Sequence, residues 1–237
     1  MSSFDAGQNL GEIKMNKTIW ALAFVVLCSG MAFAIGNASV TENTQSGWSD
    51  VTGAGSIITE GGNVSNVTLD VNTSTEKWAG AYGEVDGNLV LAENLGTANF
   101  MYTWVYDEAS GGTVCVSTNN NPTWASVVGG VAATAIDTAW SFTGSDADSA
   151  ANTVTTTASV TLNGASVTGN ATSDTASWET VIVGGLGGGG KADYGFCVAI
   201  DSTGSNYVGN AVDYELMMPT NAAASTTETY YFYAELI

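Results

Sequence analysis

The stretch from Lys77 to Tyr106, KWAGAYGEVDGNLVLAENLGTANFMYTWVY, restricts the fold of this chain more than any other. Two runs of strand-forming residues, AYGEV and NLVLA, flank Asp86 and Gly87. Asp-Gly is a pair that tolerates the positive φ angles of a two-residue type I′ turn. The pattern therefore predicts a β-hairpin centred on these two residues.

Aromatic side chains follow at every second position of the same stretch, and in a strand they would share one face. They are Phe100, Tyr102, Trp104 and Tyr106. A chain built largely of Ala, Thr and Gly needs large rings to fill its core, so we expect these rings mainly in the core. The alternative is a ligand platform, because planar rings on an open sheet face stack against sugars.

The composition extends the β prediction to the whole chain. Only 11% of the residues are charged and 29 are Gly, while Lys, Arg and Gln are scarce, which is typical of secreted β-proteins. The formal net charge of −19 repels nucleic acid. The chain has no His and no Arg, which removes the usual general base, the commonest metal ligand and the bidentate phosphate clamp. We therefore expect a non-enzymatic protein with no cofactor and no nucleic-acid partner.

Residues 15–34, MNKTIWALAFVVLCSGMAFA, have the parts of a secretory signal peptide. Lys17 gives a basic start, an apolar run extends from Ile19 to Leu27, and Ala-Phe-Ala fits a small-x-small cleavage site. We expect residues 1–34 to form a hydrophobic signal helix, translation to begin at Met15, and the protein to be extracellular or at the cell surface. A retained anchor is the alternative, although the apolar stretch is at the short limit of a span of about 17 to 25 residues.

Export would leave two cysteines, Cys115 and Cys197, each inside a strand-like run. An even count in an exported chain predicts a disulfide. It would close a loop of about 80 residues and stabilise the fold by roughly 4 kcal/mol in the chain-entropy model. Two buried free thiols are the alternative.

Sequons for Asn glycosylation cluster near the start of the exported segment. Four of five fall within residues 37–74, which predicts a glycan-bearing surface there if the host glycosylates Asn. The five asparagines are Asn37, Asn63, Asn66, Asn72 and Asn170.

Further alternating runs predict strands at residues 64–71, 194–200, 212–217 and 229–237. Inside the low-complexity region 125–180, where we expect strands, Asn163-Gly164 separates two alternating runs and predicts a second type I′ hairpin. The terminal TYYFYAELI is expected to be built into a sheet, because a free strand of this composition would aggregate. Together these patterns predict an all-β fold, an antiparallel β-sandwich of jelly-roll or Ig-like type over residues 35–237, as one domain or two packed sub-domains.

One glycine-rich segment, GLGGGGKA at Gly185 to Ala192, fits the pattern of a phosphate loop. Such a loop needs a hydroxyl after the lysine to hold Mg²⁺ and a helix whose N-terminus faces the phosphates. Here Ala192 has no hydroxyl and the following ADYGFCVAI predicts a strand. We expect a surface loop and no nucleotide.

Paired carboxylates are the only catalytic option that the composition leaves, as the two acids of a glycosidase centre. No distinctive motif surrounds any pair, so we interpret them as solubilising loop residues. Asp146 and Asp148 begin like a calcium loop, but Ala150 and Ala151 stand at the third ligand position and at the turn position. A weak Ca²⁺ site is the alternative to solvated acids there. The four pairs are Glu84 with Asp86, Asp107 with Glu108, Asp146 with Asp148, and Asp213 with Glu215.

The chain resembles the secreted Thr/Asn/Gly-rich β-sandwich proteins of archaeal cell surfaces, which include subunits of glycosylated extracellular filaments. The resemblance lies in the signal peptide, the sequon cluster, WAGAYGEVDGNLVLAENLG and YYFYAEL. It implies a structural protein that polymerises by passing an N-terminal strand into the open sheet of a neighbour. The donor would be the polar segment IGNASVTENT that begins at Ile35.

We therefore expect an extracellular structural protein that self-associates into a homopolymer, as a subunit of a cell-surface filament or surface layer. The first alternative is a carbohydrate-binding or adhesion module that binds glycans on the aromatic face. A type IV pilin and a glycosidase are weaker alternatives.

Overall fold

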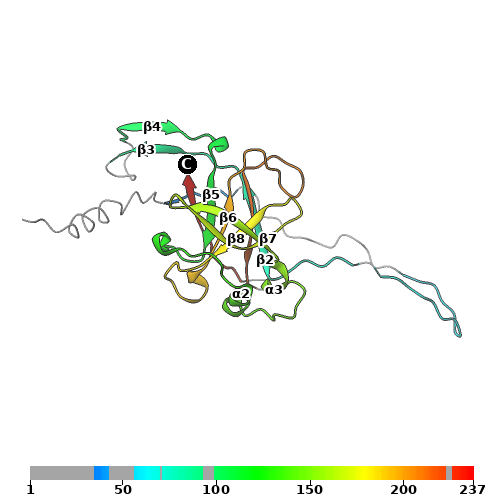
Figure 1. Ribbon diagram of the computed structural model, residues 1–237. Coiled ribbons are helices and arrows are strands. Elements are labelled where there is room, and N and C mark those ends of the chain that lie inside the picture. Colours follow the sequence, from blue (N-terminus) through cyan, green and yellow to red (C-terminus); the bar gives the residue numbers. More distant parts are fainter. Residues whose placement is uncertain (1–34, 43–55, 70, 93–98, 223–225) are drawn as a thin grey trace, which may run out of the picture. The chain divides into compact units, whose positions relative to one another are not determined.

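A computed structural model describes residues 35–42, 56–69, 71–92, 99–222 and 226–237 (Figure 1). The expected signal helix at residues 1–34 lies outside the described residues. The residues from Phe33 to Ile237 form one compact unit. Its strands are β1 (Gly36–Asn37), β2 (Trp78–Gly83), β3 (Asn88–Leu91), β4 (Tyr102–Val105), β5 (Gly112–Ser117), β6 (Thr156–Leu162), β7 (Ala165–Ser173), β8 (Glu179–Val183), β9 (Gly195–Ala199), β10 (Tyr214–Pro219) and β11 (Tyr231–Leu236).

The short helices of the described residues are two α-helices, α2 (Ala133–Trp140) and α3 (Ala150–Thr153), and three 3-10 turns, η1 (Glu108–Ser110), η2 (Trp124–Ser126) and η3 (Gly190–Asp193). Asp137 of α2 joins the two α-helices, because its carboxylate accepts hydrogen bonds from the backbone N–H groups of Ala150 (2.7 Å) and Ala151 (3.1 Å). A carboxylate at a helix start satisfies donors that the helix itself leaves unpaired.

The main sheet of the described residues has seven antiparallel strands in the order β1-β11-β5-β9-β8-β7-β6. Its central strands are buried on both faces, which explains their nearly continuous apolar sequences, TVCV in β5 and FCVA in β9. Side chains alternate between the two faces of the pleated sheet. Val114 and Val116 therefore enter one core, while Cys115 enters the other.

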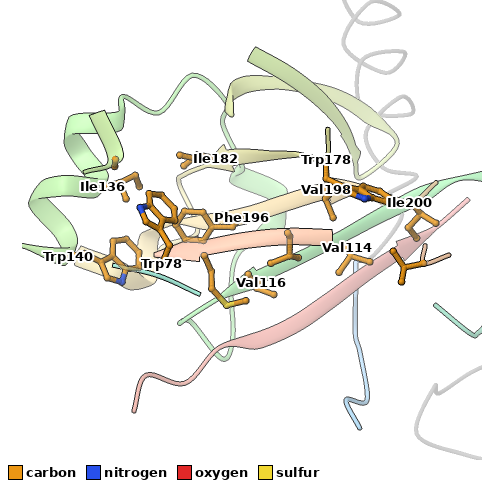
Figure 2. Close-up of a cluster of buried hydrophobic side chains, with 14 of the residues drawn as sticks. Trp78, Val114, Val116, Ile136, Trp140, Trp178, Ile182, Phe196, Val198 and Ile200 are labelled. Carbon is orange, nitrogen blue, oxygen red and sulfur yellow. The ribbon is translucent and has the colours of Figure 1, made fainter. Parts of the chain in front are cut away.

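The first core lies between this sheet and the two-stranded sheet β10-β2, whose strand β10 packs against β8 and β9. Figure 2 shows Ile136 and Trp140 of α2 beside Phe196 of β9 and Trp78 of β2. The ring centroids of Trp140 and Phe196 are 5.6 Å apart in an edge-to-face arrangement, a geometry that aromatic pairs favour. The predicted all-β antiparallel sandwich is confirmed, with two sheets facing each other across an apolar core.

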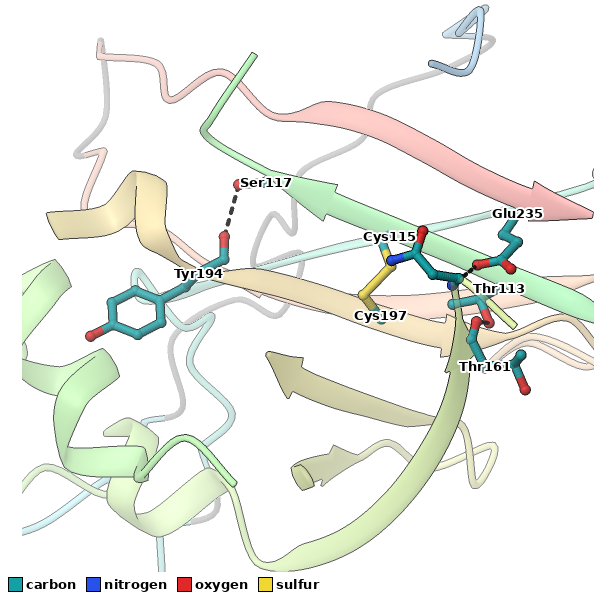
Figure 3. Close-up of a disulfide and its surroundings, with 8 residues drawn as sticks. Thr113, Cys115, Ser117, Thr161, Tyr194, Cys197 and Glu235 are labelled. Atoms are coloured by element: carbon teal, nitrogen blue, oxygen red, sulfur yellow. Dashed lines mark hydrogen bonds between the residues drawn. A yellow bond between two sulfur atoms is a disulfide. The ribbon is translucent and has the colours of Figure 1, made fainter. Parts of the chain in front are cut away.

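The second core lies on the opposite face of the main sheet, where the β6–β7 hairpin bends over it. Val160 and Leu162 of β6 pack there with Val181, Val183 and the two cysteines. The hydroxyl of Thr113 on β5 donates to the carbonyl of Thr161 on β6 at 2.7 Å, which brings together strands four places apart in the sheet (Figure 3). The sheet is therefore strongly curved and encloses this second core.

The two predicted turns have opposite outcomes. Asn163 and Gly164 have φ angles of 54° and 68° and connect β6 to β7 with Leu162 opposite Ala165, which confirms the hairpin. The prediction of a hairpin at Asp86-Gly87 is wrong, because β2 pairs with β10 and β3 pairs with β4, so the two runs that flank this turn do not pair with each other. Trp78 at the start of β2 is buried in the first core, and the partner strand of β2 is more than 100 residues away in sequence.

Other strand predictions are confirmed at β9, β10 and β11, and β6, β7 and β8 lie in the low-complexity region. That region also contains α2 and α3, which we did not predict. No strand forms among the described residues of 64–71, where we expected one. The alternating apolar side chains of that stretch have no sheet to cover, and they remain exposed.

Candidate functional site

The N-terminal strand β1 occupies the outer edge of β11. Gly36 lies opposite Ala234 and Asn37 opposite Tyr233, and the N–H of Ala38 donates to the carbonyl of Phe232 at 3.1 Å. The other edge of β11 pairs with β5 over six residues. The short β1 therefore leaves most of the outer edge of β11 without a partner strand in the described residues.

A hollow of about 370 Å³ lies beside this pairing, and we call it the edge hollow. Val40 follows β1 and borders the edge hollow. Its side chain is 56% exposed and does not fill the space. Tyr231 in its wall is 39% exposed, whereas Tyr233 is buried and donates its hydroxyl hydrogen to the carbonyl of Asn119 at 2.7 Å. The lining residues are Ala38, Val40, Asn120 and residues 230–233.

The disulfide predicted between Cys115 and Cys197 is confirmed, and it joins directly opposite residues of β5 and β9 (Figure 3). Both sulfurs lie in the second core, so the bond links the middle of the chain to its last third beneath the β6–β7 hairpin.

The turn of that hairpin is held by Glu235 of β11. Its carboxylate accepts hydrogen bonds from the backbone N–H groups of Asn163 (2.6 Å) and Gly164 (2.9 Å). The Glu235 side chain is 3% exposed. Sequence reasoning missed this contact, because nothing near Glu235 in the chain indicates a turn 71 residues away.

The four candidate platform aromatics separate into two groups. Phe100, Tyr102 and Trp104 are 44%, 57% and 49% exposed, so the expectation that they fill the core is wrong. Tyr106 is buried, and its hydroxyl donates to the carbonyl of Gly111 at 2.9 Å. Burial, together with the charges of nearby acidic side chains such as Glu108, raises the pKa of Tyr106 to about 12. Tyr106 is therefore a structural residue.

The exposed rings belong to the two-stranded sheet β3–β4, which we call the ribbon. Leu89 lies opposite Trp104 and Leu91 opposite Tyr102, so these four side chains share one face, the ribbon face. The ring centroids of Tyr102 and Trp104 are 4.7 Å apart. The ribbon face is apolar, and all four of its side chains are at least 37% exposed.

Acids from three of the four candidate pairs line one hollow of about 410 Å³, the acidic hollow. Asp213 helps to shape it, because its carboxylate accepts a hydrogen bond from the N–H of Val85 at 2.7 Å. Among the described residues, no group of three or more His, Cys, Asp or Glu side chains is arranged to hold a metal ion. The carboxylates in the lining are those of Glu84, Asp86, Glu108 and Asp213.

Asp146 and Asp148, the calcium candidates, surround a lysine. The ammonium group of Lys77 lies 3.1 Å from the Asp146 carboxylate and also contacts Asp148. The hydroxyl of Thr75 donates to Asp148 at 2.7 Å. The hydrogen bond from Lys77, followed by that from Thr75, lowers the pKa of Asp148. This ion pair fixes the start of β2. The sequence did not predict it, because Lys77 and Asp148 are 71 residues apart.

The sequons fall in different environments. Asn63, Asn66 and Asn72 are exposed. Asn170 is half-buried in β7, and its side-chain amide donates to the carbonyl of Val131 at 2.8 Å. Glycosylation attaches to that same nitrogen, so Asn170 is poorly placed for modification. Asn37 lies in β1.

The glycine-rich segment forms a loop that ends in η3 and leads directly into β9. Lys191 is engaged within the protein: its ammonium lies 2.5 Å from Glu228 and 2.6 Å from the side-chain oxygen of Asn221, over the ring of Trp140. A strand and not a helix follows the loop, as the sequence predicts.

In comparisons with known proteins, no family model, no curated protein and no solved structure matches the chain. Among the described residues, no helix is long and apolar enough to cross a membrane.

Proposed function

We propose that this protein is a non-enzymatic extracellular structural protein that self-associates into a cell-surface filament or surface layer. The observation that carries the proposal is the outer edge of β11, along which the described residues of β1 pair at two positions, and which borders the edge hollow. An open sheet edge is a template for a strand from another chain. The segment that begins at Ile35 pairs with its own β11 in the single chain, and in the polymer it would pair with the β11 of a neighbour.

Two further features support a durable extracellular subunit. The disulfide is compatible with an oxidising compartment. Residues 35–237 contain only two lysines and no arginine, and both lysines form ion pairs, which leaves few sites for proteases that cleave after basic residues.

Electron microscopy of the protein sheared from native cells, and of the purified residues 35–237, tests the proposal. Regular filaments or lattices in both preparations are expected. A stable monomer in both, with its mass measured under non-denaturing conditions, would contradict it.

Strand exchange has its own test with a peptide. A chain that begins at residue 43 lacks β1, and it should bind a synthetic peptide of residues 35–42. The A38P peptide is a matched control, because proline removes the N–H that donates to Phe232. Equal binding of both peptides would exclude edge pairing as the mode of recognition.

A carbohydrate-binding or adhesion module is the second candidate, and the exposure of Phe100, Tyr102 and Trp104 favours it. Sugars that stack on these rings should change the fluorescence of Trp104, obtained as the difference between the wild-type and W104F spectra. An unchanged spectrum over a panel of oligosaccharides would exclude this use of the ribbon.

A further inference from the structure

The ribbon is an unpartnered element. Among the described residues, β3 and β4 pair only with each other, and every residue of β4 is exposed. A two-stranded ribbon is only marginally stable alone in water. An exposed apolar face such as the ribbon face marks a contact with another molecule.

A second element with exposed apolar side chains precedes β2, and we call its described residues, 56–69 and 71–76, the arm; Thr75 near its end is bound to Asp148. All of these described residues are exposed, and the chain makes a turn at Gly61-Gly62. Val67, Leu69 and Val71 are 49%, 81% and 74% exposed. In an extended chain these three side chains project to one side. The alternate positions Asn66, Thr68 and Asn72, of which the two asparagines are sequon residues, project to the other side.

The arm and the ribbon are attached to opposite ends of β2. The arm ends at Glu76, next to Lys77, which Asp146 and Asp148 hold. The ribbon begins at Asn88, after Val85 is bound to Asp213. The six residues of β2 between these anchors span about 20 Å at about 3.3 Å per residue. Two complementary surfaces at opposite ends of one rigid strand favour head-to-tail contact between copies.

The exposed areas allow a weak contact. With about 150 to 250 Å² for each fully exposed large side chain, the ribbon face and Phe100 expose roughly 500 Å², and Val67, Leu69 and Val71 expose roughly 300 Å². A contact of about 800 Å² in total is below the range of stable specific interfaces and fits a weak one. The association through this contact alone is therefore expected to be weak, and it becomes strong only where the same two copies also exchange a strand at β11, because two linked contacts act together.

We propose that the Val67, Leu69 and Val71 side of the arm packs against the ribbon face of a second copy of this chain, in head-to-tail order. The inference rests on the proposed self-association and names the surfaces that meet. Asn66 and Asn72 then point to solvent, where glycans are tolerated. A protein partner fits the ribbon face better than a sugar, because Leu89 and Leu91 stand beside the rings where a sugar site needs hydrogen-bonding groups.

Complementation between two variants of the 35–237 chain tests this arrangement. L91S/W104S damages the ribbon face and L69S/V71S damages the arm. V128S/Y207S is the matched control, since these residues are similarly exposed at 54% and 59% but lie outside both surfaces. Each damaged variant alone should associate at least about tenfold more weakly than the control in sedimentation equilibrium. With A38P added to every variant to block strand exchange at β11, an equimolar mixture of the two should form 1:1 dimers that grow no further, because each pair has one intact arm and one intact ribbon face.

If a double substitution unfolds the chain, the fluorescence of Trp104 tests the same contact without it. The emission of Trp104, taken as the difference between wild type and W104F, should shift to shorter wavelength as the protein concentration rises. The single variant L69S should weaken this shift, and T68S, on the opposite side of the arm, should not.

The inference is overturned if the damaged variants associate like the control, or if their mixture stays monomeric. Filaments that depend on residues 35–42 but are unaffected by these variants would overturn it and leave the proposed function intact. Dimers that depend on the arm and the ribbon face but never form a polymer would support this inference and contradict the proposed function. A shift of Trp104 emission on adding oligosaccharide, with no change in mass, would assign the ribbon face to sugar binding instead.

Discussion

Replacing Glu235 with alanine removes a side chain that fastens the β6–β7 turn to β11. Two hydrogen bonds are lost, from Asn163 at 2.6 Å and from Gly164 at 2.9 Å. A hydrogen bond to a charged group contributes about 1.5 to 3 kcal/mol, but water can replace the acceptor at the exposed Gly164. We therefore expect E235A to lower the free energy of unfolding by about 2 to 4 kcal/mol.

Urea denaturation followed by tryptophan fluorescence measures this loss, with the slope of the transition unchanged if both states keep their compactness. E235Q should lose less than E235A, because its amide oxygen still accepts one of the two bonds. E179A is the matched control, since Glu179 is exposed on β8, and its effect should stay within about 0.5 kcal/mol. If E235A were no more harmful than E179A, the clamp would contribute nothing and our account of the curved sheet would be wrong.

Three further predictions concern other groups. Replacing both Cys115 and Cys197 with alanine should reduce the free energy of unfolding by about 4 kcal/mol, read from urea midpoints, since the unfolded chain is no longer closed into a loop across a separation of 82 residues and gains conformational entropy. Burial, assisted by the nearby charge of Asp174 and opposed by the hydrogen bond from the N–H of Tyr207, raises the pKa of Glu215, so the folded chain binds a proton there more tightly than the unfolded chain does. That contribution is complete at acidic pH and is lost as the pH rises through the folded pKa, and E215Q should flatten this part of the curve of Tm against pH. In a host that glycosylates Asn, mass spectrometry should find Asn170 unmodified, because its amide is bound to a backbone carbonyl.

The sequence predicted those parts of the fold that local patterns determine. Asn163-Gly164 predicted its turn, because both positions need positive φ and the flanking runs pair with each other. The central apolar runs predicted buried strands, and two cysteines in such runs predicted the disulfide. The turn and the strands depend on residues that are neighbours in the chain, and the disulfide was predicted from the even number of cysteines.

The parts that the sequence did not predict depend on distant partners. The AYGEV run and the NLVLA run both have strand-forming sequences and contribute to β2 and β3. Because β2 pairs with β10 and β3 pairs with β4, Asp86-Gly87 connects two different sheets. The aromatic period of two correctly placed Tyr102 and Trp104 on one face, yet that period is the same for a core and for a surface. Only the absence of a covering layer among the described residues distinguishes them.

Salt dependence separates an apolar assembly contact from an ionic one. Two acidic and two basic residues precede Ile35, so residues 35–237 keep the formal charge of −19, and any two copies repel each other. Raising NaCl from about 0.01 M to about 1 M shortens the screening length from about 30 Å to about 3 Å, which removes most of this repulsion. The apolar contact between arm and ribbon face is not weakened by screening. Association measured by sedimentation should therefore strengthen with salt in the wild type, and much less in L91S/W104S. Association that weakens with salt would point to ion pairs as the main attraction. The two lysines of this segment are already paired to Asp146, Asp148 and Glu228, so these lysines could form such pairs only by breaking their internal ones.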